Sequence, residues 1–91
     1  MAKLTCFAIA GVQLWFYSND HSPPHFHARR RGQWEYRVNF LLPTEEMFEL
    51  VWSKKKTRMP KAHRELLQQM VEQYRFEILQ EWEEKVNANE N

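Results

Sequence analysis

HFHARRRGQWEYRVNF, residues 25–40, is the stretch that decides the fold, because apolar and polar residues alternate on both sides of a single glycine. Alternation with a period of two is typical of β-strands that bury one face. The pattern predicts strands over residues 25–31 and 34–42, with Gly32 in the connection between them. We therefore expect a β-hairpin.

The register of this hairpin follows from the side chains that must share its buried face. These are Phe26 and Ala28 on the first strand and Trp34, Tyr36, Val38 and Phe40 on the second. Only a loop with an odd number of residues places them together, so we expect a three-residue loop at 31–33 with Gly32 at positive φ. The polar face then has the cross-strand pairs His25–Asn39, His27–Arg37 and Arg29–Glu35.

Working outward, the pattern predicts further strands at 12–17 and 47–52, and a shorter one at 5–9. Residues 18–24 contain turn formers and two prolines, which predicts an ordered loop. From Pro60 to about Val86 there is no further Gly or Pro, which indicates one long helix. We expect an α+β fold in which a small, mostly antiparallel sheet of about four strands packs against this helix, with the His25/His27 face accessible.

An apolar stripe runs along the predicted helix, made by Leu67, Met70, Val71, Tyr74, Ile78 and Trp82 and widened by Leu66, Leu79 and Val86. A helix of about 26 residues is about 39 Å long, which exceeds the length of a short strand. The part of the helix that extends beyond the sheet has two possible arrangements. It is buried by a second copy or a partner protein, or the helix curves around a single core. Phe76 lies opposite the stripe and is expected to be exposed.

Composition indicates one folded unit. At 91 residues, with 43% hydrophobic and 14% aromatic residues, the chain supports a single core over 1–86, and residues 87–91 are expected to be a disordered tail. The single cysteine, Cys6, excludes an internal disulfide and predicts a reducing, cytoplasmic compartment, with Cys6 packed as a small apolar residue. No apolar run approaches the about 18 residues that a membrane span requires.

Charge is divided along the chain. Residues 1–64 hold 11 Lys and Arg against 5 Asp and Glu, whereas residues 65–91 hold 2 against 7. A basic front half suits a polyanionic partner. Two oppositely charged, solvated faces that attract each other are the alternative.

Histidines are the chemically distinctive residues, since His21, His25 and His27 lie close together beside Asp20. This set could ligate zinc or a similar divalent metal, with an open coordination position. His25 and His27 could instead act as general acid and base on a phosphodiester, with Arg37 stabilising the developing charge. In a third interpretation, they support a hydrogen-bonded loop.

Two basic runs suggest a nucleic-acid surface. They are Arg29–Arg31 and Lys54–Lys56 with Arg58, and Trp15, Tyr17 and Trp52 could stack on bases of single-stranded RNA. Solubilising charge on loops, and protection of edge strands, are the alternatives.

The stretch NDHSPPHFHA, residues 19–28, followed by a glycine-centred hairpin and a terminal helix with LQEW at 79–82, resembles a family of short prokaryotic proteins known as domain of unknown function four-one-six-zero. The resemblance implies a toxin–antitoxin-like, paired two-gene context and a shared site at Asp20, His21, Pro24, His25 and His27. This sequence departs from the family pattern in RRRGQWEYR, 29–37, and KKKTRMPK, 54–61.

These patterns predict a small cytosolic interaction module that binds a protein or RNA partner, and the resemblance implies that it is the toxin-like member of a paired system. The binding residues we expect are Asp20, His21, Asn39, Arg29, Trp15 and Tyr17. The alternative is a histidine-based nuclease acting on RNA, either metal-dependent or using His25 and His27 as an acid–base pair with Arg37.

Overall fold

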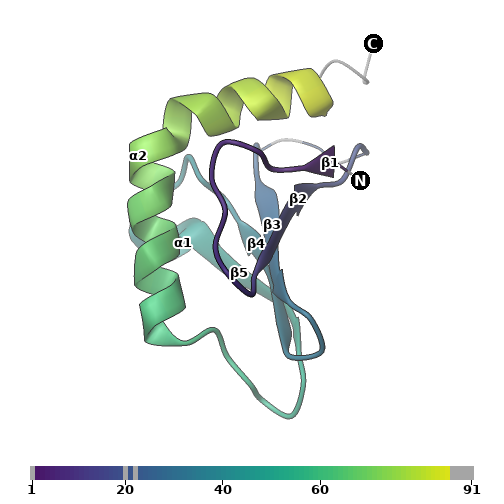
Figure 1. Ribbon diagram of the computed structural model, residues 1–91, viewed down its shortest axis with the longest axis vertical. Helices are drawn as coiled ribbons and strands as arrows, with labels where there is room; N and C mark the ends of the chain where they lie inside the picture. The colour runs from purple at the N-terminus through teal and green to yellow at the C-terminus, as the bar shows by residue number, and fades with distance from the viewer. Residues whose placement is uncertain (1, 20, 22, 87–91) are drawn as a thin grey trace.

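A computed structural model describes residues 2–19, 21 and 23–86 (Figure 1). Five strands form one antiparallel sheet in the order β1-β2-β3-β4-β5: Ala2–Lys3, Gln13–Phe16, Phe26–Arg30, Trp34–Val38 and Phe48–Ser53. A short helix α1, Thr44–Met47, precedes β5, and a long helix α2, Lys61–Lys85, is the last element in chain order. The α+β class and the long C-terminal helix are confirmed. The expected tail, 87–91, lies outside the described residues.

The β3–β4 hairpin has the register that its alternation predicts. His27 pairs with Arg37 and Arg29 with Glu35, and Gly32 has a φ of 77° in the loop between Arg30 and Trp34. Because Gly lacks a Cβ, this left-handed conformation costs it little. The ladder ends at Phe26 and Val38, so the predicted pair His25–Asn39 lies beyond it.

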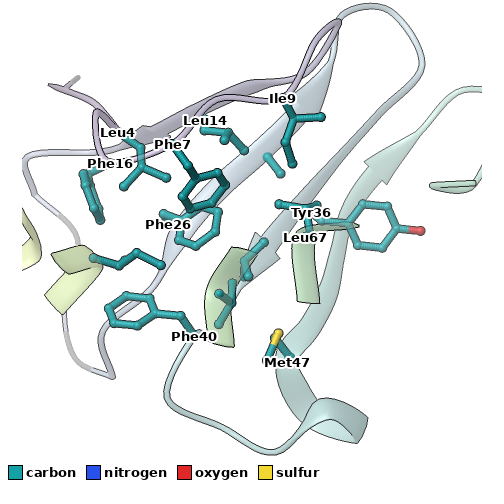
Figure 2. Close-up of a cluster of buried hydrophobic side chains, with 14 of the residues drawn as sticks. Leu4, Phe7, Ile9, Leu14, Phe16, Phe26, Tyr36, Phe40, Met47 and Leu67 are labelled. Atoms are coloured by element: carbon teal, nitrogen blue, oxygen red, sulfur yellow. The ribbon is translucent and has the colours of Figure 1, made fainter. Parts of the chain in front are cut away.

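One face of this hairpin is the floor of the core. Phe26, Ala28, Trp34, Tyr36, Val38 and Phe40 are all buried, as predicted, and Figure 2 shows Phe26, Tyr36 and Phe40 in one cluster with Leu67 of α2. Along the helix, Leu67, Val71, Ile78 and Trp82 are fully buried. Burying a large apolar side chain contributes about 1.5–3 kcal/mol, so this contact between helix and sheet supplies much of the stability.

The N-terminal segment departs from the expectation of a strand at 5–9. The chain leaves the sheet after β1, where the Leu4 amide donates to the Leu14 carbonyl at 3.0 Å, and residues 5–8 form no strand. Phe7 instead packs in the core against Phe26 and Tyr74, with ring centroids 6.2 and 5.8 Å away. Burial of one large aromatic ring therefore outweighs the pairing that the alternation predicted. The segment forms the wide loop that begins the chain in Figure 1.

Helix α2 bends at Tyr74, whose φ of −113° and ψ of 17° are not helical. Figure 1 shows the C-terminal part turning across the end of the sheet. Val86, at the far end of the stripe, is fully buried, whereas Phe76 is 69% exposed, as expected. The C-terminal part of the stripe therefore curves around the core of one copy, whereas Leu66, near the start of the helix, is 39% exposed. Among the described residues, no helix has the length and apolar character to cross a membrane.

Glu81 ties the N-terminal segment to the bent end of α2. Its two carboxylate oxygens accept hydrogen bonds from the backbone amides of Thr5 and Cys6, each 2.8 Å long, and Lys85 donates a third. Lys85 also donates to the Lys3 carbonyl at 2.9 Å. Burial alone would raise the pKa of Glu81, but these hydrogen bonds lower it below its ordinary value.

The thiol of Cys6 lies in the same contact. Burial, followed by its hydrogen bond to Glu81 and the charge of that carboxylate, raises the pKa of Cys6 to about 12. The thiolate is therefore disfavoured, and Cys6 packs against the core as an inert side chain, as the sequence predicts.

Replacing this carboxylate by an amide tests the contact. Glu81→Gln should lower the free energy of unfolding at pH 7 by about 1–3 kcal/mol, because an amide cannot accept both backbone bonds and the lysine. The folded-state pKa is lowered, so the stabilisation is present above the ordinary carboxyl pKa and is lost as pH falls through the folded value. Urea unfolding at pH 7 and pH 3 measures both effects. Glu84→Gln, at an exposed position on the same helix, is the control and should change stability by less than about 0.5 kcal/mol.

Candidate functional site

A cluster of buried polar residues lies on the sheet and at its end. This histidine cluster consists of His25, His27, Glu35 and Asn39, each less than a tenth exposed. His27 and Glu35 come from β3 and β4, while His25 and Asn39 lie just beyond the paired ends of those strands. The alternation that buries Phe26 and Val38 against α2 turns the neighbouring side chains to the other face of the sheet.

His27 is packed between aromatic rings. Trp15 is its direct neighbour on β2 and stacks on the imidazole, with centroids 5.4 Å apart and planes inclined at 24°. Tyr17 approaches edge-on at 4.6 Å. The His27 Nδ1 lies 3.6 Å from the Glu35 carboxylate, which forms an ion pair when the imidazole is protonated.

His25 links this cluster to the end of α2. Its Nδ1 lies 2.9 Å from the Pro23 carbonyl, and because a carbonyl only accepts, this nitrogen carries the proton. Its ring lies 5.1 Å from that of His27 and 5.4 Å from Trp82. The imidazole therefore sits at the junction of loop, sheet and helix.

The expectation of an accessible histidine face is wrong. His25 is 2% exposed and His27 is 7% exposed. The alternation correctly placed both histidines away from Phe26, but it contained no information about which large rings would cover them. Those rings are Trp15 and Tyr17 over His27, and Trp82 beside His25.

Arg37 borders the cluster and is partly open to solvent. Its Nε donates to the Asn39 side-chain oxygen at 2.9 Å and lies 3.6 Å from the Glu49 carboxylate. The guanidinium is therefore held by an amide and a carboxylate on the sheet, next to the covered histidines. Its side chain is 29% exposed.

Two further residues of the predicted histidine-loop site, His21 and Pro24, are described by the structure. His21 is exposed in the loop before β3, and Pro24 is half-buried beside His25. Within residues 2–19, 21 and 23–86, no three His, Cys, Asp or Glu side chains are grouped so that they could hold a metal ion. Asp20, which the sequence places beside this loop, lies outside the described residues.

The residues predicted for stacking on RNA differ in accessibility. Trp15 is 3% exposed, because His27 stacks on it and the Arg29 guanidinium lies 4.9 Å from its ring centroid. Tyr17 is half-buried, whereas Trp52 on β5 is 40% exposed. Trp52 is therefore the aromatic residue of this set with a free surface.

Both basic runs meet at one end of the sheet. Antiparallel pairing puts the end of β5 beside the start of β4, and the Lys54 amide donates to the Gln33 carbonyl of the hairpin loop at 2.9 Å. We call this surface the basic end and define it as Arg30, Arg31, Lys54, Lys55, Lys56 and Arg58. In the part of the chain that the structure describes, none of these six side chains has an acidic partner within 4.0 Å.

The lysines of the basic end form a strained turn. The Thr57 amide donates to the Lys54 carbonyl at 2.8 Å, and the two residues between them have positive φ, 46° at Lys55 and 65° at Lys56. Positive φ at both central residues is typical of a type I′ turn, which prefers Asn and Gly. Strain of this kind gathers at functional positions, so the lysines here need an explanation beyond turn formation.

Neither basic run predicts this juxtaposition by itself. The signal was present, because an antiparallel β4–β5 pair requires that the residue after β5 lie beside the residue before β4. Applied to the predicted strands, that rule places Lys54 beside Gln33, in the hairpin loop that also contains Arg31.

Comparisons with known proteins identify a family but no function. A family model described as domain of unknown function (DUF4160) matches residues 11–83, which include the histidine cluster and the basic end. No curated protein and no solved structure matches.

The packing of His27 predicts a structural contribution. His27→Ala should lower the free energy of unfolding by about 1–3 kcal/mol, because it leaves a void between Trp15 and Tyr17. Gln73→Ala, at an exposed position on α2, should change it by less than about 0.5 kcal/mol. Urea titrations followed by circular dichroism compare the two. Equal stability of both variants would contradict the packing role.

Proposed function

The chain belongs to the DUF4160 family, and from that premise we propose that it is a small interaction module that binds single-stranded RNA through the basic end. The meeting of two basic runs, distant in sequence, on one surface supports this proposal most directly. Its occupant is the phosphate backbone, with bases stacking nearby.

Electrostatics favour a polyanion at this surface. Five of its six residues are exposed and Arg30 is half-buried, and their charges are not neutralised by carboxylates in the described part of the chain. Neighbouring like charges repel one another, and a bound phosphate backbone relieves that repulsion while releasing counterions. Solubility alone would be served by lysines at unstrained positions.

Trp52 makes a nucleic acid a better fit than another polyanion. It lies near the end of β5, two residues before Lys54, and its indole is 40% exposed. Stacking of a base on an aromatic ring contributes about 1–3 kcal/mol and requires unpaired bases, which favours single-stranded RNA over a duplex.

The histidine cluster enters this proposal as support for the sheet. A histidine-based nuclease, the alternative, needs both imidazoles within hydrogen-bond reach of a phosphodiester. In this structure aromatic rings pack against His25 and His27, which leaves the basic end as the better-supported surface. A toxin-like role in a paired system, implied by the family resemblance, would use this surface to hold its RNA.

The turn lysines allow a direct test. A triple variant, Lys54→Ser, Lys55→Asn and Lys56→Gly, removes three charges while introducing the residues that a type I′ turn prefers. Its fold should be retained, its affinity for a fluorescent RNA of about 12 nucleotides should fall, and the slope of log K against log salt should become shallower by about 2. Fluorescence anisotropy at several salt concentrations measures both quantities.

Matched controls test whether RNA binding depends on the basic end or only on the total positive charge of the chain. Arg75→Gln removes a cation that donates to the Phe40 carbonyl, at the opposite end of β4, and should leave the slope unchanged. Trp52→Ala should weaken binding about tenfold or more, whereas Phe76→Ala, at an exposed aromatic residue on α2, should not. Unchanged RNA binding in the triple variant would refute the proposal, and a protein partner would then be the occupant to seek.

A further inference from the structure

A cavity of about 530 Å³ lies between the N-terminal segment and β2, among residues that the proposed function does not use. Its apolar wall includes Leu4, Phe7, Ile9 and Trp15, all less than a tenth exposed. In Figure 2, Leu4, Phe7 and Ile9 lie along the segment that runs above Leu14 of β2. The size falls within the range of small-molecule sites, about 300–1,000 Å³.

The charged side chains that line this cavity are all positive. Lys3 and Arg29 are its charged lining residues, and its lining contains no carboxylate. The Arg29 guanidinium is already oriented, because its Nε and Nη2 donate to the Gln13 side-chain oxygen at 2.9 and 2.7 Å and its Cζ lies over Trp15. A cation that is held in place loses little conformational entropy when an anion binds.

Because apolar walls lie beside two cations, a ligand that fits this cavity has an apolar body and a negative charge. We propose that this cavity binds one small organic anion, an aryl or medium-chain carboxylate, with the apolar body against Leu4, Ile9 and Trp15 and the carboxylate toward Lys3 and Arg29. The site is independent of RNA binding, since it shares no residue with the basic end.

Methyl groups in the wall provide the readout. The probe is 1-naphthoate, titrated into the full chain and followed through the ¹³C-methyl resonances of Leu4, Ile9, Val12 and Leu14. Saturable shifts with one-to-one stoichiometry and a Kd below about 1 mM are expected. The neutral analogue 1-naphthalenemethanol, of nearly the same shape, should bind about tenfold more weakly because it has no charge to meet the cations.

Two loop variants locate the ligand. Ala8→Trp adds a ring at an exposed residue that lines the cavity and should abolish the shifts, whereas Ala10→Trp adds the same ring outside the lining and should retain them. Arg29→Gln should reduce the preference of naphthoate over the alcohol to about threefold or less. Backbone amide spectra verify that each variant is folded.

Three results would overturn the proposal. They are the absence of saturable shifts at about 1 mM probe, equal affinity for acid and alcohol, or unchanged binding in folded Ala8→Trp. If Ala8→Trp fails to fold, the comparison of Arg29→Gln with the original chain decides the question by itself.

Discussion

The register of the β3–β4 hairpin is the constraint on which the rest of the structure depends. A three-residue loop with Gly32 at positive φ places Phe26 and Ala28 on the same face as Trp34 and the residues that alternate with it. Because strand side chains alternate with a period of two, a slip by one residue would expose this floor and bury the charged face instead. The contact with α2, the position of the histidines and the location of the basic end all follow from this register.

A second constraint is the mismatch between a 25-residue helix and a small sheet. A straight helix would leave its apolar C-terminal part without cover. The bend at Tyr74 turns that part across the end of the sheet, and Glu81 then binds the amides of Thr5 and Cys6. The N-terminal segment and the bent part of α2 are thereby joined by a carboxylate whose pKa is lowered by the bonds that it accepts. The N-terminal segment held in this way also forms one wall of the cavity.

The two sets of candidate functional residues differ in burial: the histidines are covered, whereas most of the lysines and arginines of the basic end are exposed. His25 and His27 carry reactive side chains, but the aromatic rings around them make them part of the packing of the sheet. Lysines and arginines are common on protein surfaces, but the antiparallel order of β3, β4 and β5 brings two runs together around a turn with positive φ at Lys55 and Lys56. The lysines and arginines of the basic end, although common residue types, therefore form a better candidate binding site than the histidines.

The sequence by itself determined the class of fold, the hairpin register, the long helix and the exposure of Phe76, because these depend on local periodicity and on one glycine. It did not determine that residues 5–9 would leave the sheet, since alternation cannot show that Phe7 gains more by packing between Phe26 and Tyr74. It also placed the histidines on one face without showing that Trp15 and Tyr17 would cover them. Only the tertiary structure decided these points, and with them the bend of α2 and the joining of the basic runs. Each of them depends on contacts between residues that are distant in sequence. A local pattern of apolar and polar residues does not show which of several competing contacts buries the most apolar surface.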